Sequence, residues 1–179
     1  PRTMMMSLYG DMDISKITEK PAKRKKITTL SKPEKKINEL WPFIKKQILD
    51  KNQIFWVCPL IEESAFLDYS SAKKKFKIIS NKFPNEVGLI HGALKNDEKE
   101  EILKKFLQKK ISILVTTTVI EVGIDFPNEN LIVIENANKF GLAQLHQLRG
   151  RVGRGENQGT CILLFKDGLS KNAIKRIKI

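Results

Sequence analysis

The sequence predicts an α/β fold with a mostly parallel sheet that carries helices on both faces. Short segments that are apolar along their whole length, such as residues 54–57 and 161–165, indicate strands buried on both sides. Segments of 10–20 residues with helical spacing separate them, which is the alternation that builds a parallel sheet. Several runs of unusual residues follow these strands directly, at the edge of such a sheet where ligands bind.

The elements follow in order along the chain. Strands are predicted over residues 27–30, 53–60, 86–90, 111–116, 131–135 and 160–165. Helices are predicted over residues 64–83, 96–110, 141–153 (in most of its length) and 169–177.

One further helix is predicted between the first two strands. We expect it to begin with Ser31 as the cap, Pro33 in the first turn and Glu34 in a capping box, and to run towards Asn52. Pro42 lies inside this stretch and predicts a kink or a break.

Composition limits the classes of function. A chain of 179 residues with 41% hydrophobic residues can bury one domain core, and no apolar run approaches the roughly 20 residues of a membrane span. The net charge of +13 favours a polyanionic partner, although 27 of the 33 basic residues are Lys and could reflect compositional bias. Cys58 and Cys161 lie in apolar runs and are expected to be buried free thiols in a reducing compartment.

Residues 147–154, Gln-Leu-Arg-Gly-Arg-Val-Gly-Arg, contain three of the six arginines in the chain. On a helix, Gln147, Arg151 and Arg154 share one face, and Gly150 and Gly153 suggest the close approach of another body. Guanidinium groups presented in this way suit the negative charge of a phosphoryl group in transfer. The alternative is a set of cations that interact with the dipole at a helix end.

The segment that follows the strand over residues 111–116 combines hydroxyls, a glycine and a carboxylate. Thr117 can bond phosphate oxygens, Gly123 allows close approach of the backbone, and Asp125 can accept from a ribose hydroxyl. Ordinary turn chemistry at a strand end explains the same pattern, and both interpretations stay open.

Two other strand ends carry candidate residues. His91, Gly92 and Lys95 follow a strand and could contact a phosphate backbone, whereas two histidines in the whole chain make a metal site improbable on spacing alone. Trp56 lies inside an apolar strand, so we expect a core residue rather than a base-stacking platform.

The sequence contains no Gly-x-x-x-x-Gly-Lys-Ser/Thr loop and no acidic box after a strand, so the chain can supply only half of an ATP site.

The chain resembles the RecG family of ATP-dependent DNA helicases over nearly its whole length. The motifs that carry the resemblance are residues 7–13, 56–64, 117–125 and 140–155, the last of which is shared with the Mfd transcription-repair translocases. The resemblance implies a RecA-like three-layer αβα lobe, the second motor lobe of a superfamily-two helicase. Residues 27–167 would form this lobe, residues 1–26 a lead-in from the preceding lobe, and residues 168–179 the truncated start of a C-terminal helical segment.

The same resemblance implies roles for individual residues. Arg151 and Arg154 occupy the arginine-finger positions, and Gly123, Asp125 and Gln147 face the nucleotide. Residues that face the DNA backbone are implied to be Thr117, His91, Gly92 and Lys95. The implied cofactors are ATP and Mg²⁺, with Mg²⁺ held by the first lobe, and no metal is held by this chain.

The resemblance also implies partners and a cellular role. The full-length protein would unwind branched or double-stranded DNA and regress stalled forks in DNA repair and recombination, as a monomer in the bacterial cytoplasm, associated with the nucleoid and without a membrane. Its first RecA-like lobe and its wedge domain would be partners of this lobe. Two alternatives remain: an Mfd-like translocase lobe, and a non-catalytic nucleic-acid-binding module.

Overall fold

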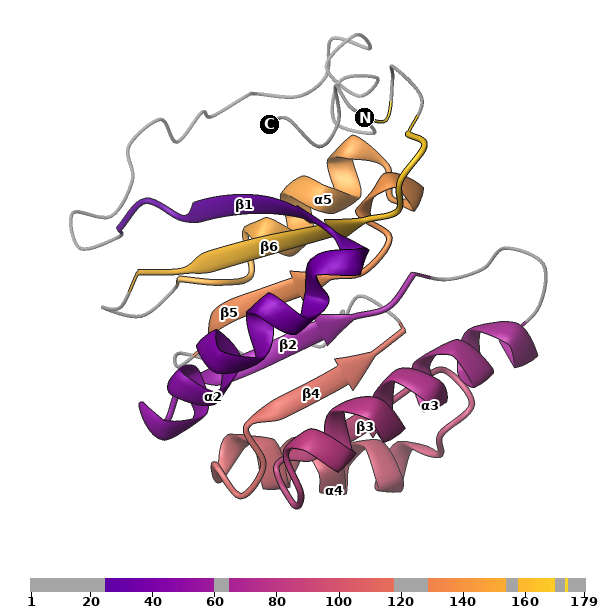
Figure 1. Ribbon diagram of the computed structural model, residues 1–179. Coiled ribbons are helices and arrows are strands. Elements are labelled where there is room, and N and C mark those ends of the chain that lie inside the picture. Colours follow the sequence, from indigo (N-terminus) through magenta and orange to yellow (C-terminus); the bar gives the residue numbers. More distant parts are fainter. Residues whose placement is uncertain (1–24, 60–64, 118–128, 154–157, 170–172, 174–179) are drawn as a thin grey trace, which may run out of the picture.

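The computed structural model describes residues 25–59, 65–117, 129–153, 158–169 and 173. In these ranges one six-stranded sheet has the order β1-β6-β5-β2-β4-β3, and every neighbouring pair is parallel. The strands are β1 (Thr28–Pro33), β2 (Gln53–Val57), β3 (Val87–Ile90), β4 (Ile113–Thr116), β5 (Glu129–Ile134) and β6 (Thr160–Phe165). The predicted α/β class with a parallel sheet is confirmed (Figure 1).

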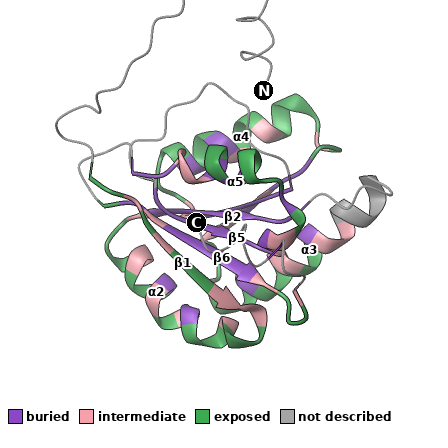
Figure 2. Ribbon diagram, turned by 90° about the horizontal axis from the view of Figure 1, so that it is seen from above, coloured by how far each residue is buried: buried purple, intermediate pink, exposed green. Residues whose placement is uncertain are grey.

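Helices cover both faces of this sheet. The helical elements are η1 (Glu34–Leu40), α2 (Trp41–Leu49), α3 (Ala65–Lys82), α4 (Asn96–Leu107), η2 (Ala137–Lys139) and α5 (Leu142–Arg149). Viewed along the sheet, α2 and α3 lie below it, and α4 and α5 lie above it (Figure 2). This is the three-layer αβα arrangement that the resemblance implied.

Two hydrophobic clusters hold the layers together, one on each face of the sheet. On the α4 and α5 face, Leu103, Phe106 and Leu148 pack against side chains of β2, β4, β5 and β6. On the α2 and α3 face, Ile44 and Ile79 pack with Trp56 and the alternate side chains of the same strands. Strands buried on both faces explain why the apolar runs in the sequence are continuous.

Trp56 is a core residue, as predicted. Its side chain is fully buried in β2 and stacks on Trp41, with ring centroids 5.7 Å apart. The base-stacking alternative is therefore excluded for this side chain. Cys58 and Cys161 are buried free thiols, which confirms the prediction of an internal position for both.

The predicted helix start at Ser31 was wrong. Strand β1 continues to Pro33, because residues 28–33 pair in register with β6 as far as Phe165. The helical segment begins at Glu34, with Pro33 as a cap that makes no side-chain hydrogen bond. The break that Pro42 predicted is present, since η1 ends at Leu40 and Pro42 lies in the first turn of α2.

Other boundaries differ by a few residues. The helix predicted over residues 96–110 ends at Leu107, and its cap is Lys95. On this helix Leu103 and Phe106 are buried, whereas Leu107 is 45% exposed. In the part of the chain that the structure describes, no helix is long and apolar enough to cross a membrane.

Candidate functional site

Four strands end side by side at the carboxyl edge of the sheet, where candidate residues gather. The backbone N–H of Thr117 donates to the carbonyl of Ile90 at 3.4 Å, so β4 ends beside β3. The N–H of Cys58 donates to Thr116 at 2.8 Å, and the N–H of Glu135 donates to Val57 at 2.9 Å. The residues that follow the strands therefore form a row along this edge, in the order His91, Thr117, Cys58 and Glu135.

The structure brings two of the predicted DNA-contacting residues together at the β3 and β4 end of this row. His91 is 9% exposed and Thr117 is 3% exposed, so each presents little of its side chain to solvent. Burial lowers the pKa of His91, and the nearby cations Lys99 and Lys73 lower it further, against the opposing charge of Glu98. We therefore expect a neutral imidazole at pH 7, which can bond a phosphate but adds no charge.

Gly92 and Lys95 extend this group towards solvent. A Cβ added to Gly92 would meet no atom within 4 Å, so the packing of this chain does not require a glycine there. Lys95 is exposed at the start of α4, and its backbone N–H donates to the Glu98 carboxylate at 3.0 Å. An exposed glycine backbone next to an exposed lysine suits contact with the phosphate backbone of a nucleic acid.

The arginine segment lies at the amino edge of the sheet, beside the first residues of β1 and β6. Helix α5 follows β5 and packs through Leu145 and Leu148, while Gln147 faces solvent. Helix α5 ends at Arg149, and Arg151 follows in a turn in which its N–H donates to Leu148 at 3.1 Å. The prediction that Gln147 and Arg151 share a helix face was wrong, because Gly150 caps the helix before Arg151.

The proposed reason for the paired glycines also needs correction. Gly153 has a φ of +71°, and a Cβ there would lie 3.2 Å from the backbone of Gly159. A Cβ on Gly159 would lie 2.8 Å from the Gly153 nitrogen. The tight crossing of these two backbones within the chain requires small residues, so another body is not needed to explain Gly153.

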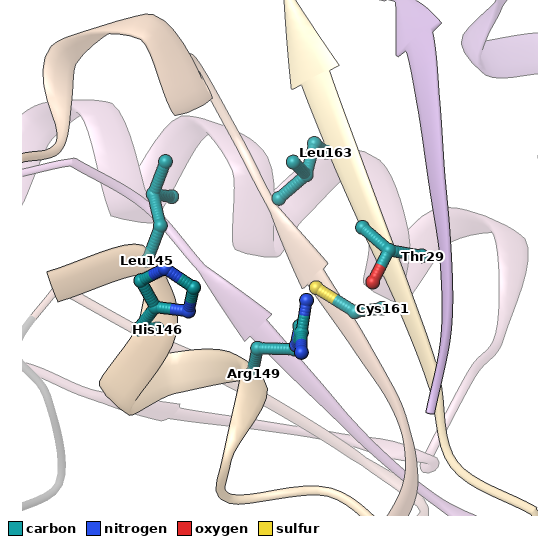
Figure 3. A pocket seen from close by; sticks show the side chains of 6 residues that line it. All are labelled: Thr29, Leu145, His146, Arg149, Cys161 and Leu163. Atoms are coloured by element: carbon teal, nitrogen blue, oxygen red, sulfur yellow. The ribbon is translucent and has the colours of Figure 1, made fainter. Parts of the chain in front are cut away.

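Arg149 has a role inside the fold that the sequence did not reveal. It lines a small pocket between α5 and the strands β1 and β6, and its side chain points towards Cys161 and Thr29 (Figure 3). Burial raises the pKa of the Cys161 thiol to about 12, and the charge of Arg149 opposes this shift. Arg149 and Arg151 are both half-buried, but Arg149 is the last residue of α5 and lines this pocket, whereas Arg151 follows the helix.

Gln147 and Arg151 lie apart from the DNA candidates His91 and Thr117. The segment from β5 through α5 to Arg151 returns to β6, whereas His91 and Thr117 follow β3 and β4. Three strand spacings separate β6 from β4, which amounts to about 14 Å. Gly123, Asp125 and Arg154 lie outside the described residues, so their predicted roles remain predictions. Within the described ranges, no group of His, Cys, Asp and Glu side chains could hold a metal.

Comparison with known proteins identifies the class to which this fold belongs. Residues 35–156 match the family described as the helicase conserved C-terminal domain, and the chain belongs to this family. Domain 2 of the DEAD-box helicase Mss116p, bound to an RNA duplex, has a TM-score of 0.57 at 23% identity and covers 78% of this chain and 54% of its own, which shows a shared fold.

The chain is more similar to one group of helicases, the RecG proteins. The chain is 44% identical to the ATP-dependent DNA helicase RecG of Thermotoga maritima over 99% of its length, and 43% identical to that of Bacillus subtilis over 100%. A structure of RecG bound to a three-way DNA junction has a TM-score of 0.81 at 41% identity over 99% of this chain. The chain spans about a quarter of these relatives, covering 23%, 26% and 23% of their lengths.

Proposed function

We propose that this chain is the second motor lobe of a RecG-type ATP-dependent DNA helicase, which moves on double-stranded or branched DNA and regresses stalled forks. The observation that carries the proposal is similarity to RecG proteins over the whole chain, including the segment that contains Arg151. Similarity of this extent to RecG proteins favours this class over an Mfd-type lobe.

The chemistry of the described residues fits one half of a nucleotide site. Gln147 is exposed on α5 and Arg151 follows the helix end, so an amide and a guanidinium group are available for phosphate oxygens. When ATP and Mg²⁺ are bound, the nucleotide supplies the phosphoryl group and the metal spreads its charge. Arg151, and by the same proposal Arg154, would stabilise the charge that develops during transfer, and the first lobe would hold Mg²⁺.

The rest of the proposal concerns the whole protein. The DNA backbone would run over Thr117, His91, Gly92 and Lys95 at the carboxyl edge of the sheet, beyond β3 and β4. The full-length helicase would be a monomer that acts in DNA repair and recombination in the bacterial cytoplasm, on the nucleoid. Its wedge domain and first lobe would supply fork recognition and ATP binding, so this chain alone is expected to hydrolyse no ATP.

Substitution of Arg151 in the full-length helicase tests the proposal. We expect Arg151→Ala to lower kcat for DNA-stimulated ATP hydrolysis by about 10³-fold, with ATP binding retained, because an arginine finger acts on the transition state. Arg151→Lys keeps the positive charge but loses the guanidinium group that donates two parallel hydrogen bonds. We therefore expect ATP hydrolysis by this variant to remain strongly impaired. Wild-type turnover in both variants would support the non-catalytic alternative. ATP hydrolysis by this chain alone that Arg151→Ala abolishes would overturn the view that the chain supplies only half of the site.

A further inference from the structure

A buried charge pair lies at the carboxyl edge of the sheet, where Glu135 follows β5. Lys75 shares a face of α3 with Ala72 and Ile79, both of which are fully buried. Its ammonium group forms an ion pair with the Glu135 carboxylate, and the two side chains are only 13% and 6% exposed. A lysine on the apolar face of a helix is costly to bury unless it is paired.

The pair lies beside two neighbouring strands whose connections leave on opposite faces of the sheet. Strand β2 leads into α3 on one face of the sheet, and β5 leads into η2 and α5 on the other face. Neighbouring parallel strands whose connections leave on opposite faces open a crevice beyond their carboxyl ends. At this point of the topology Glu135 directly follows β5, and Lys75 of α3 pairs with it.

Further contacts tie the pair to both strands. The Cys58 thiol donates to the second Glu135 oxygen at 3.6 Å, and the Lys75 ammonium lies 5.8 Å from the centre of the Trp56 ring. Burial raises the pKa of Glu135, Lys75 lowers it, and the charge of Glu34 at the start of η1 raises it. The pKa of Glu135 is raised on balance, and the pairing with Lys75 is the main influence that opposes this rise.

Glu135 also begins the segment that leads to Arg151. The next residue, Asn136, has a left-handed backbone with a φ of +45°, and η2 and α5 follow. Ala137, Phe140 and Leu148 are buried along this path, so a shift at its start is passed on by packed side chains. Resting on the proposed function, we propose that Lys75 and Glu135 are positioning residues that hold this segment against β2 and α3 and so place Arg151 for catalysis.

The test uses the full-length helicase that contains this chain. We expect Lys75→Met to lower kcat for ATP hydrolysis by about tenfold or more, with KM for ATP within about twofold, because a small misplacement weakens the transition state more than ground-state binding. Lys75→Arg keeps the ion pair and should retain kcat. Lys74→Met, a change of the same type at an exposed position on α3, should have no effect.

The double variant Lys75→Met/Glu135→Gln separates positioning from stability. It buries no unpaired charge, so we expect its Tm to recover while kcat stays low and KM unchanged. This variant also carries the test if Lys75→Met alone does not fold. Wild-type kcat in the folded double variant would overturn the inference and leave the proposed function intact. If Arg151→Ala also turned over normally, the proposed function itself would fail.

Discussion

Gly153 is the clearest case in this chain of a residue fixed by its backbone. Its φ of +71° is a conformation that side-chain-bearing residues rarely adopt, and the backbone of Gly159 leaves 3.2 Å for a Cβ. We expect Gly153→Ala to lower the free energy of unfolding by about 1–3 kcal/mol. Urea denaturation followed by circular dichroism would measure the loss.

Gly141 provides the matched control for this substitution. A Cβ there would meet only the Gln144 side chain, at an ordinary 3.6 Å, and the φ of Gly141 is −67°. Gly141→Ala should change the free energy of unfolding by no more than about 0.5 kcal/mol. Equal losses at the two positions would show that backbone strain does not explain the glycine at 153.

Cys161 predicts a pH dependence of stability. Burial raises its pKa to about 12 in the folded chain, whereas the unfolded thiol has a value near 9.0. The folded state therefore holds the proton that the unfolded state releases, and stability is lost as the pH rises from about 9 towards 12. The loss should approach about 1.4 kcal/mol per pH unit for this group.

Comparison with Cys161→Ala isolates this contribution. Denaturation curves at several values between pH 8 and pH 10.5 should show a shallower decline for the variant than for the wild type. The buried thiol of Cys58, whose pKa burial also raises, remains in both proteins and contributes equally. Parallel declines would mean that Cys161 is not protected from ionisation by the fold.

At the level of elements, burial within the sheet should determine local stability. Among the described strands, β2 pairs with both β4 and β5 and is buried at all five residues, whereas β1 lies at the edge and pairs with β6 alone. We expect hydrogen-bonded amides of β2 to exchange only through global unfolding and those of β1 to exchange faster. Hydrogen exchange measured by NMR would contradict this if β1 were as protected as β2.

The sequence predicted the elements well where the signal is local. The strand over residues 160–165 has the predicted bounds because it is one continuous apolar run between polar residues. The extension of β1 to Pro33 could not be read in this way, since it depends on pairing with a strand 132 residues further on, from Pro33 to Phe165. Proline is tolerated there because β1 is at the edge of the sheet.

The geometry of the candidate site could be predicted from the sequence less well than the helices and strands. The run over residues 147–154 indicated the arginine segment, but the end of α5 depends on the turn at Gly150 and on the crossing of Gly153 with Gly159. The Lys75 and Glu135 pair was missed, although the spacing of Ala72, Lys75 and Ile79 places a lysine on the apolar face of α3. Its partner lies 60 residues away in sequence, from position 75 to 135, and only the fold identifies it.

For the whole molecule, the residues predicted to contact DNA and the predicted arginine finger Arg151 lie at different edges of the sheet. The β3 and β4 end exposes Gly92 and Lys95, and the segment after α5 carries Arg151. A net charge of +13 attracts any polyanion to the whole surface, so affinity for DNA alone would not identify the binding face. The salt dependence of binding can identify this face, because its slope reports how many cations of the protein neutralise phosphates.

Lys95→Gln compared with Lys104→Gln therefore tests the DNA-binding face in the full-length helicase. Both lysines are exposed and belong to α4 or its cap, but Lys95 lies at the carboxyl edge and Lys104 near the opposite end of the helix. Both variants lose the same charge. If Lys95 contacts a phosphate, its loss should reduce the slope of log K against log salt for duplex DNA by about 1, with no change for Lys104. Equal slopes in the two variants would mean that the positive charge of the chain acts diffusely and that the DNA lies elsewhere.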